Sequence, residues 1–277
     1  MEKFRTNITK LDLPRLLKAP VDIRVRKPKI TIIMLHGIGN SAAGWDILKE
    51  TLPSDARVIA LDLLGFGISP KPSKASYNLR LQARSVAMTL LKMRISTKVI
   101  IVGHSMGALI ATELAKRYPL MVHGLVLCSP PIYRNYGEVP DITPRGERIL
   151  YKIYNSTIVD INKKPERYIT LARRAARIRL ASPAFSITKE TIVPYVAALQ
   201  SAIMKQSTFA DIQALKMPVR IIYGTLDPFV VAKNFKYLAK YNPHISAQSV
   251  MSAHEVRRPY VKPVTKAIAA IRAEIKK

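Results

Sequence analysis

Apolar and polar positions follow two different periods along the chain, and their order predicts an alternation of strands and helices. Short runs rich in β-branched residues are typical of buried strands, and residues 21–26 alternate as a half-exposed strand does. The other predicted strands cover 30–35, 57–62, 99–102, 124–128, 219–223 and 245–250. The predicted helices beside them cover 45–52, 79–93, 106–118, 231–241 and 264–275. This order predicts an α/β fold with a doubly wound, mostly parallel sheet.

The alternation stops between residues 131 and 212, where no run of β-branched residues occurs. Helical patterns punctuated by prolines take its place, at 146–154, 166–180 and 189–205. An insertion between two core strands would cover the carboxyl-terminal edge of the sheet, where ligands bind in open α/β folds. We therefore predict a core made of residues 20–130 and 213–277 and a helical cap made of residues 131–212.

The most informative motif is the turn between a predicted strand and the helix that begins at Met106. It has the form Gly-x-Ser-x-Gly, with Ser105 at its centre between Gly103 and Gly107. A turn of this kind is so tight that only glycine fits on either side of the serine. It holds the Ser105 hydroxyl at the top of the sheet, which makes this residue a candidate nucleophile.

A serine nucleophile needs a histidine base, and the histidine needs a carboxylate that sets its tautomer. Both should follow later core strands, in the order serine, acid, histidine. Of the five histidines, His254 alone fits this order, because it comes just after the predicted strand 245–250. Asp227 directly follows the strand 219–223 and is the candidate acid, whereas Glu255 is expected to face solvent.

Stabilising a tetrahedral intermediate requires two N–H groups aimed at its oxyanion. We expect one from Met106, directly after the candidate nucleophile, and one from Ile38 in the loop after the strand 30–35. Gly37 would let the backbone of this loop approach a substrate closely, so it is a candidate substrate-binding residue. This chemistry needs no metal ion and no organic cofactor.

The composition is that of a soluble globular protein. Hydrophobic residues make up 48% of the 277 residues and aromatic residues 7%, which is enough for a large core. The single cysteine, Cys128, permits no intrachain disulfide. The first 20 residues lack the apolar region of a signal peptide, and polar residues interrupt the apolar stretch 99–115. We therefore expect a cytoplasmic protein.

The net charge of +27 is large, and Lys and Arg outnumber Asp and Glu in every part of the chain. A nucleic-acid module would concentrate its charge on one element, and neither a zinc-finger spacing nor an aromatic RNA-binding motif is visible. We therefore expect no specific nucleic-acid partner and only a loose, salt-sensitive association with anionic surfaces. The oligomeric state is left open.

With these residues in place, the chain resembles the α/β-hydrolase superfamily over roughly residues 20–275. Five blocks carry the resemblance, namely His36–Gly39, Trp45 with Asp62–Ser69, Gly103–Gly107, Gly224–Asp227 and Ala253–Val256. They are similar to the branch that contains small carboxylesterases, monoacylglycerol lipases and carbon–carbon bond hydrolases with a helical cap. Ser105 separates the chain from haloalkane dehalogenases and epoxide hydrolases, which carry aspartate at that position.

The chain departs from this resemblance at a few positions. Ala108 stands where many relatives have a second glycine, and Leu64 stands where a proline is common. Some related enzymes carry their acid after the strand that ends here at Cys128, but Ser129 and two prolines occupy that stretch. Asp227 is therefore favoured as the acid.

The predicted cap contains two groups of side chains that could meet a substrate. Its aromatic residues could form an apolar wall, although helix packing is the more common role, and they are Tyr133, Tyr136, Tyr151, Tyr154, Tyr168, Phe185 and Tyr195. Arg173 and Arg177 share one predicted helix face, opposite Leu171, Ala175 and Ile178. This face is either solvated or a clamp for a substrate carboxylate or phosphate, with Arg173 as the candidate binding residue.

These observations favour a serine hydrolase that cleaves a small carboxylic ester, as a carboxylesterase or a monoacylglycerol lipase does, through an acyl-enzyme intermediate. Two alternatives stay open. One is a carbon–carbon bond hydrolase or lyase that acts on a keto acid with the same triad, and the other is a noncatalytic ligand-binding protein on the same scaffold. Nucleic-acid binding through bulk charge is a weaker fourth hypothesis.

Overall fold

The computed structural model describes residues 12–134, 145–178 and 182–276. Within them, seven strands form one sheet in the order β1-β3-β2-β4-β5-β6-β7. The strands are β1 (Lys18–Ile23), β2 (Ile30–Leu35), β3 (Ala56–Asp62), β4 (Val99–His104), β5 (Gly124–Cys128), β6 (Val219–Gly224) and β7 (Ile245–Val250). Strand β1 pairs with β3 in the antiparallel direction, and the other pairs are parallel. The predicted α/β fold with a mostly parallel sheet is confirmed.

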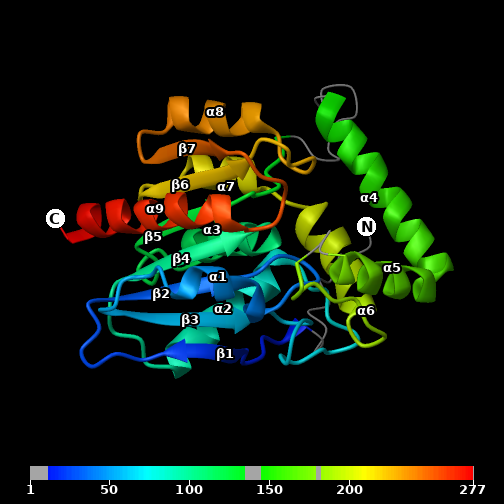
Figure 1. Cartoon of the computed structure of the whole chain (residues 1–277), viewed down its shortest axis with the longest axis horizontal. Coiled ribbons are helices and arrows are strands. Elements are labelled where there is room, and N and C mark those ends of the chain that lie inside the picture. Colours follow the sequence, from blue (N-terminus) through cyan, green and yellow to red (C-terminus); the bar gives the residue numbers. More distant parts are fainter. Residues whose placement is uncertain (1–11, 135–144, 179–181, 277) are drawn as a thin grey trace, which may run out of the picture.

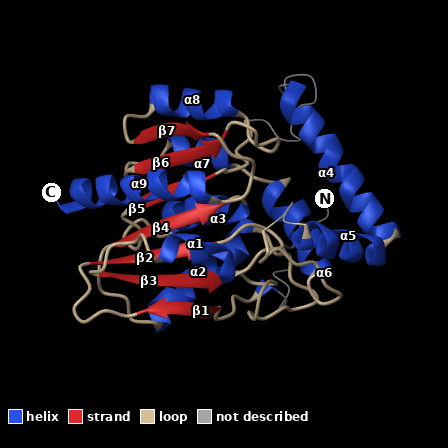
Figure 2. Ribbon diagram, in the orientation of Figure 1, coloured by secondary structure: helices blue, strands red, loops and turns tan. Residues whose placement is uncertain are grey.

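Helices cover both faces of this sheet, as Figures 1 and 2 show. Every residue of β2, β4 and β5 is buried, because these central strands have apolar helices on both sides. On one face pack α2 (Leu79–Lys92), α3 (Met106–Arg117) and α8 (Ala232–Tyr241). On the other pack η2 (Ala42–Trp45), α1 (Asp46–Lys49) and α9 (Arg258–Lys276). The alternation of strands and helices in the sequence thus produces a doubly wound core.

A helical insertion lies between β5 and β6, beyond the carboxyl ends of the parallel strands (Figure 1). It contains α4 (Arg145–Lys163), α5 (Pro165–Arg177) and α6 (Ile192–Ala198), which continues as the π-helix η3 (Leu199–Ile203). We call these elements the cap. A small apolar cluster, which includes Ile161 of α4, Ile169 of α5 and Ile192 of α6, holds them together. The insertion of a helical cap is confirmed, and its boundaries at 131 and 212 stay a prediction.

Three helices differ from the extents that the sequence predicts. The helix α7 (Thr208–Gln213), which was not predicted, is short and packs against α3 and α8. The helix α9 begins at Arg258 rather than at 264 and continues through Pro263, although proline lacks the N–H of a helix hydrogen bond. The helix α6 begins only at Ile192, because the N–H of Thr188 donates to the Thr191 hydroxyl in a preceding turn.

The structure shows which side of α5 is buried, a question that the sequence leaves open. Leu171 and Ile178 lie opposite Arg173 and Arg177 along the helix, as the sequence predicts, but this face is not buried, because Leu171 is 45% and Ile178 is 72% exposed. The buried side of α5 is formed by Ile169 and Ala172 instead. Three arginines, Arg173, Arg174 and Arg177, lie near the end of α5, and Ile169 and Ala172 belong to the apolar cluster that joins it to the other cap helices.

Candidate active site

The turn between β4 and α3 places Ser105 at the carboxyl edge of the sheet. Its backbone has φ 51° and ψ −122°, a region that a non-glycine residue seldom occupies. A Cβ atom on Gly107 would lie 2.1 Å from the carbonyl oxygen of Leu35, and one on Gly103 would lie 2.6 Å from the carbonyl oxygen of Gly107. Both neighbours are backbone atoms that cannot move aside. The two glycines therefore permit the strained conformation that presents the Ser105 hydroxyl.

The predicted partners of Ser105 come together at the same edge. His254 follows β7, and its Nε2 atom lies 2.9 Å from the Ser105 Oγ atom. Asp227 follows β6, and its Oδ2 atom lies 2.7 Å from the His254 Nδ1 atom. The Asp227 side chain is fully buried and the His254 side chain is 20% exposed. Three residues that are far apart in the sequence thus form one hydrogen-bonded chain.

Asp227 is held in its ionised form despite its burial. Burial raises the pKa of the Asp227 carboxyl, but the hydrogen bond and charge of His254 lower it, as do hydrogen bonds from the Ser129 hydroxyl and the Phe229 N–H. The Phe229 N–H donates to the Asp227 Oδ1 atom at 2.9 Å. The net effect is a pKa below the ordinary value. A carboxylate in this state accepts the Nδ1–H of His254 and leaves Nε2 free to accept a proton from Ser105.

Two further histidines, His104 and His36, do not fit the expected order of the triad, but both contact backbone groups of the site. His104 Nε2 lies 2.8 Å from the backbone carbonyl oxygen of His254, and a neutral ring in this position donates a hydrogen bond. Burial lowers the pKa of His104, so its ring remains neutral. His104 thereby fixes the backbone that carries the His254 side chain. In the sequence, His104 is marked only by its position directly before Ser105.

His36 orients the loop that follows β2. Its Nε2 atom accepts the Leu63 N–H at 3.0 Å, so its Nδ1 atom carries the proton and donates to the Gly37 carbonyl oxygen at 2.7 Å. In a trans peptide the next N–H, that of Ile38, points away from this carbonyl. A Cβ atom on Gly37 would lie 3.1 Å from the Ser105 Cβ atom, so the loop passes directly beside Ser105.

The second predicted donor, Met106, is the first residue of α3 and is fully buried. The first N–H groups of a helix have no partner within it, and they carry its partial positive charge. Ile38 is half-buried and packs against the large core cluster on the α3 side of the sheet. Both amides therefore belong to elements that border Ser105.

The cap contacts the same loop. The Ser186 N–H donates to the Gly39 carbonyl oxygen at 2.7 Å. Gly39 has φ 72°, and a Cβ atom there would lie 2.6 Å from the Phe185 ring and 3.2 Å from the Tyr195 ring. These two predicted cap aromatics therefore lie over the loop that carries Ile38.

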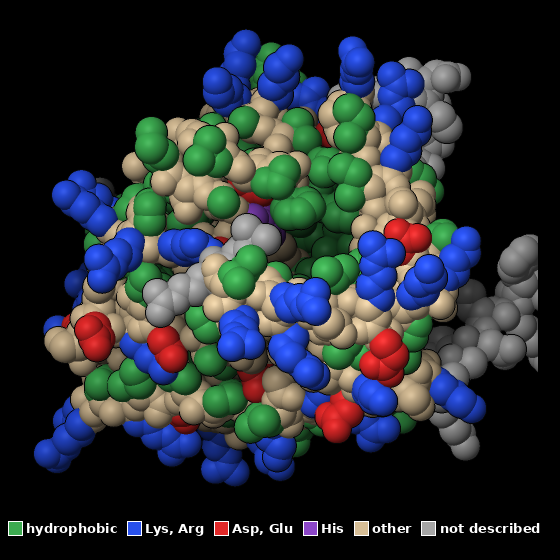
Figure 3. All heavy atoms as spheres, turned by 45° about the vertical axis from the view of Figure 1, so that its right-hand side comes forward, with side chains coloured by type: hydrophobic (Ala, Val, Ile, Leu, Met, Phe, Trp, Pro, Cys, Tyr) green, Lys and Arg blue, Asp and Glu red, His purple; other side chains and the backbone are tan. Residues whose placement is uncertain are grey.

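Aromatic rings also lie against His254. The Phe229 ring packs edge-on against the His254 ring at 5.0 Å, and the Tyr154 ring stacks on Phe229 at 6.2 Å. Figure 3 shows a hollow on the cap side of the molecule, lined by hydrophobic side chains, with a histidine inside it and Lys and Arg side chains around it. Arg173 is exposed on α5, and Tyr136 lies outside the described residues.

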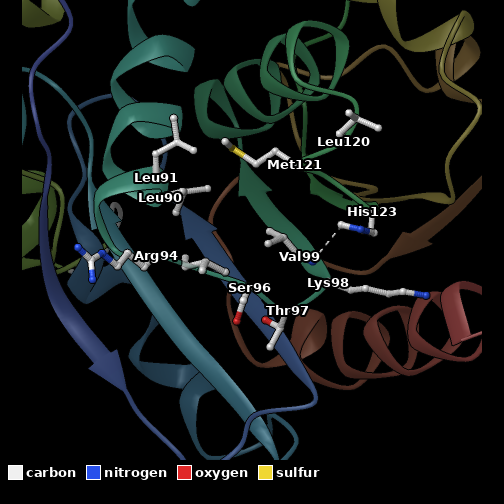
Figure 4. Close-up of a pocket in the computed structure, with 11 residues that line it drawn as sticks. Leu90, Leu91, Arg94, Ser96, Thr97, Lys98, Val99, Leu120, Met121 and His123 are labelled. Carbon is white, nitrogen blue, oxygen red and sulfur yellow. Dashed lines mark hydrogen bonds between the residues drawn. The ribbon is translucent and has the colours of Figure 1, made fainter.

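A separate surface pocket of about 380 Å³ lies at the opposite end of β4 (Figure 4). It is lined by the end of α2 and by Lys98, Val99 and His123, and the His123 Nδ1 atom accepts the Val99 N–H at 3.2 Å. The length of β4, about 20 Å, separates this pocket from Ser105. It takes no part in the site.

Residues 12–134, 145–178 and 182–276 contain no group of three or more His, Cys, Asp or Glu side chains arranged to hold a metal ion. In the same part of the chain, no helix is both long enough and apolar enough to span a bilayer. Cys128 is buried at the end of β5, where burial raises the pKa of its thiol.

Comparison with known sequences identifies related proteins. The sequence pattern of the family described as "alpha/beta hydrolase fold" matches residues 30–256. A pimeloyl-(acyl-carrier protein) methyl ester esterase of Aeromonas hydrophila is 27% identical over 237 residues, which cover 83% of this chain and 89% of that protein. A probable lysophospholipase of Arabidopsis thaliana, BODYGUARD 4, is 33% identical over 111 residues, or 39% of this chain. This match spans only 27% of the plant protein's length.

Solved structures share the fold. An enol-lactonase from Burkholderia xenovorans has a TM-score of 0.68 at 18% identity, over 92% of this chain and 95% of that one. An epoxide hydrolase from Bacillus megaterium has a TM-score of 0.71 at 17% identity, over 92% of this chain and 96% of that one. At these identities the likeness concerns the fold alone.

Proposed function

The chain belongs to the family of the alpha/beta hydrolase fold, and on this premise we propose that it is a serine hydrolase that cleaves a small carboxylic ester. The observation that carries the proposal is the chain of hydrogen bonds from Ser105 through His254 to Asp227, with distances of 2.9 and 2.7 Å. These distances suit proton transfer between a nucleophile and its base. The ester-cleaving activities named for two sequence relatives support the same reaction class.

In the proposed mechanism, His254 Nε2 accepts the Ser105 proton while the Ser105 oxygen attacks the ester carbonyl carbon. The buried Asp227 carboxylate stabilises the imidazolium that forms. The N–H groups of Ile38 and Met106 donate to the oxyanion of the tetrahedral intermediate. His254 then gives the proton to the departing alcohol, which leaves an acyl group on Ser105. Attack by water, with His254 again as base, releases the acid.

The residues around the hydrogen-bonded Ser105, His254 and Asp227 indicate which class of substrate would fit. Phe229, Phe185 and Tyr195 are aromatic residues beside His254 and the Ile38 loop, and they suit the apolar part of an acyl chain or alcohol. Gly37 lies beside Ser105 and would flank the carbonyl group. The exposed Arg173 of the cap would attract the free end of an anionic ester.

The test is hydrolysis of p-nitrophenyl esters of graded acyl length by the wild type and by Ser105→Ala. We expect kcat/KM of the variant to fall by about 10³-fold or more, because the nucleophile is lost. The matched control is Ser156→Ala, which removes an exposed hydroxyl from α4 and should leave kcat/KM unchanged. Hydrolysis that survives in Ser105→Ala would contradict the proposal. A folded wild type that cleaves no ester but cleaves a keto acid would favour a carbon–carbon bond hydrolase.

A further inference from the structure

Phe229 contacts two residues of the proposed mechanism, Asp227 and His254, through different groups. Its N–H donates to the Asp227 Oδ1 atom at 2.9 Å, and its ring packs edge-on against the His254 ring at 5.0 Å. The other carboxyl oxygen of Asp227, Oδ2, lies 2.7 Å from the His254 Nδ1 atom. The position of the Phe229 backbone therefore affects the carboxylate and the imidazole together.

The Phe229 carbonyl group is held by a buried tyrosine from another part of the sequence. Tyr133 follows β5, and its hydroxyl donates to the Phe229 carbonyl oxygen at 2.9 Å. The same hydroxyl lies 3.0 Å from the Tyr154 hydroxyl of the cap helix α4. A backbone carbonyl can only accept, so the one proton of Tyr133 lies toward Phe229, and Tyr154 donates to the Tyr133 oxygen. A row of hydrogen bonds thus runs from the cap to the residue whose N–H fixes Asp227.

The segment that carries Tyr133 is tied to the cap and to the core. The carboxyl group of Glu147 in α4, which is completely buried, accepts the Arg134 N–H at 3.2 Å and an N–H of the Asn234 side chain at 2.8 Å. The Asn234 side chain of α8 also donates to the Ile132 carbonyl oxygen at 2.9 Å. These bonds hold the residues on both sides of Tyr133, so its hydroxyl is kept in one place.

The two tyrosines are better explained by these hydrogen bonds than by apolar packing alone. The Tyr154 ring does stack on the Phe229 ring, with the centroids 6.2 Å and the planes 13° apart, but a phenylalanine could stack equally well. A buried hydroxyl is costly to desolvate unless it is hydrogen-bonded. Burial raises the pKa of Tyr154, so its hydroxyl keeps the proton that it donates to Tyr133.

We propose that Tyr133 is a positioning residue that holds the segment 227–229 where the Asp227 carboxylate meets His254. Through Tyr154, the position of the cap helix α4 acts on the same segment. When this segment shifts, Asp227 holds the Nδ1–H of His254 less well, and the proton of Ser105 is transferred less readily. This inference rests on the proposed function, because it assumes that His254 acts as a base toward Ser105.

The test measures how fast a fluorophosphonate probe modifies Ser105, because this reaction needs the activated serine but no particular ester. The main variant is Tyr133→Phe, which removes the hydroxyl and keeps the buried ring. We expect the rate of modification to fall about fivefold, because the Phe229 carbonyl group loses the hydrogen bond that fixes it. For whichever ester the wild type cleaves, kcat should fall while KM stays unchanged.

The matched control is Tyr77→Phe. Tyr77 is also buried, and its hydroxyl donates to the Pro72 carbonyl oxygen at 2.8 Å. Each variant therefore loses one hydrogen bond from a tyrosine to a backbone carbonyl, and their melting temperatures should fall by similar amounts. Only Tyr133→Phe should slow the modification of Ser105, because a purely structural role would not change this rate.

A second variant, Tyr154→Phe, removes the hydroxyl that the cap contributes and keeps the stacked ring. We expect a smaller loss of rate, about twofold, because Tyr133 still donates to Phe229 but no longer accepts from the cap. Combining it with Tyr133→Phe should cause no further loss, because the Tyr154 hydroxyl acts only through Tyr133.

Three results would overturn the positioning role while the proposed function stands. One is a Tyr133→Phe protein that the probe modifies at the wild-type rate. Another is an equal loss of rate in Tyr77→Phe, which would show a general effect of stability. The third is an additional loss in the double variant, which would show that Tyr154 does not act through Tyr133.

The proposed function can also fail separately. If the probe modifies the wild type but no ester is cleaved, the proposed function is contradicted, and the rates of the variants still decide the role of Tyr133. A wild type that the probe does not modify at all would overturn both proposals.

Discussion

At the scale of single residues, two neutral histidines hold backbone groups that border Ser105. His36 accepts one backbone N–H and donates to the Gly37 carbonyl oxygen, and only the neutral ring can do both. Burial lowers the pKa of His36 from 6.5 to about 4, against the raising effect of the Gly37 hydrogen bond. The orientation of the Ile38 amide is thus coupled to the protonation of the buried His36 ring.

This coupling predicts a pH dependence of stability. Between pH 6.5 and about 4 the unfolded chain binds a proton at His36 and the folded chain does not, so the stabilisation is complete above pH 6.5 and is lost as the pH falls toward 4. The loss should be on the order of 3 kcal/mol. His36→Gln removes the titrating group. Urea unfolding at several pH values should show a shallower acid loss for the variant. Equal slopes would mean that His36 is not buried as a neutral ring.

The residues of the site differ in how readily the sequence reveals them. Ser105, Asp227 and His254 could be predicted, because a motif and the order of strands place them at one edge. His36 and His104 could not, because no sequence pattern links a histidine beside a turn to the backbone groups that its ring contacts.

At the scale of elements, the turn from β4 to α3 decides where the nucleophile stands. The approach of Gly107 to the Leu35 carbonyl oxygen joins α3 to the end of β2, and therefore joins Ser105 to the Ile38 loop. Buried strands and the helices beside them were predictable because their apolar runs are long and regular. The buried side of α5 was not, since Leu171 and Ile169 are equally apolar and only packing selects between them.

The glycine spacing makes a quantitative prediction. Gly107→Ala should lower the free energy of unfolding by about 3 kcal/mol, because its Cβ atom would lie 2.1 Å from a backbone oxygen. Gly146→Ala, on an exposed turn of α4 with no atom within 4 Å of the new Cβ, is the matched control. It should be neutral or stabilising by up to about 1 kcal/mol. Denaturant unfolding measures both. Equal effects would show that α3 does not approach β2 so closely.

At the scale of the whole molecule, an apolar hollow is surrounded by basic side chains. On the face that Figure 3 shows, Lys and Arg side chains are scattered among hydrophobic ones and also surround the hollow. With a net charge of +27, their summed field should attract anionic molecules from any direction. Under the proposed function, we expect the charge to affect how substrates reach the site, and the hydrogen bonds from Ser105 to His254 and Asp227 to affect the reaction itself.

If the basic surface attracts anionic substrates, salt should affect the KM of an anionic ester and of a neutral ester differently. Raising NaCl from about 20 mM to about 500 mM should increase KM several-fold for a p-nitrophenyl ester with a free carboxylate, because salt screens the basic surface. KM for a neutral ester of equal length should change little. Arg173→Ala should raise KM for the anionic ester only. Equal salt effects on both esters would mean that the charge does not guide substrate binding.

The proposed function requires that Ser105 carries an acyl group during turnover. The most direct measurement is to quench the wild type with acid while it hydrolyses a p-nitrophenyl ester, and to locate the added acyl mass by peptide mass spectrometry. We expect an acyl group on Ser105 of the wild type, and none on the Ser105→Ala protein. An acyl group on another residue, or turnover by Ser105→Ala at the wild-type rate, would contradict it.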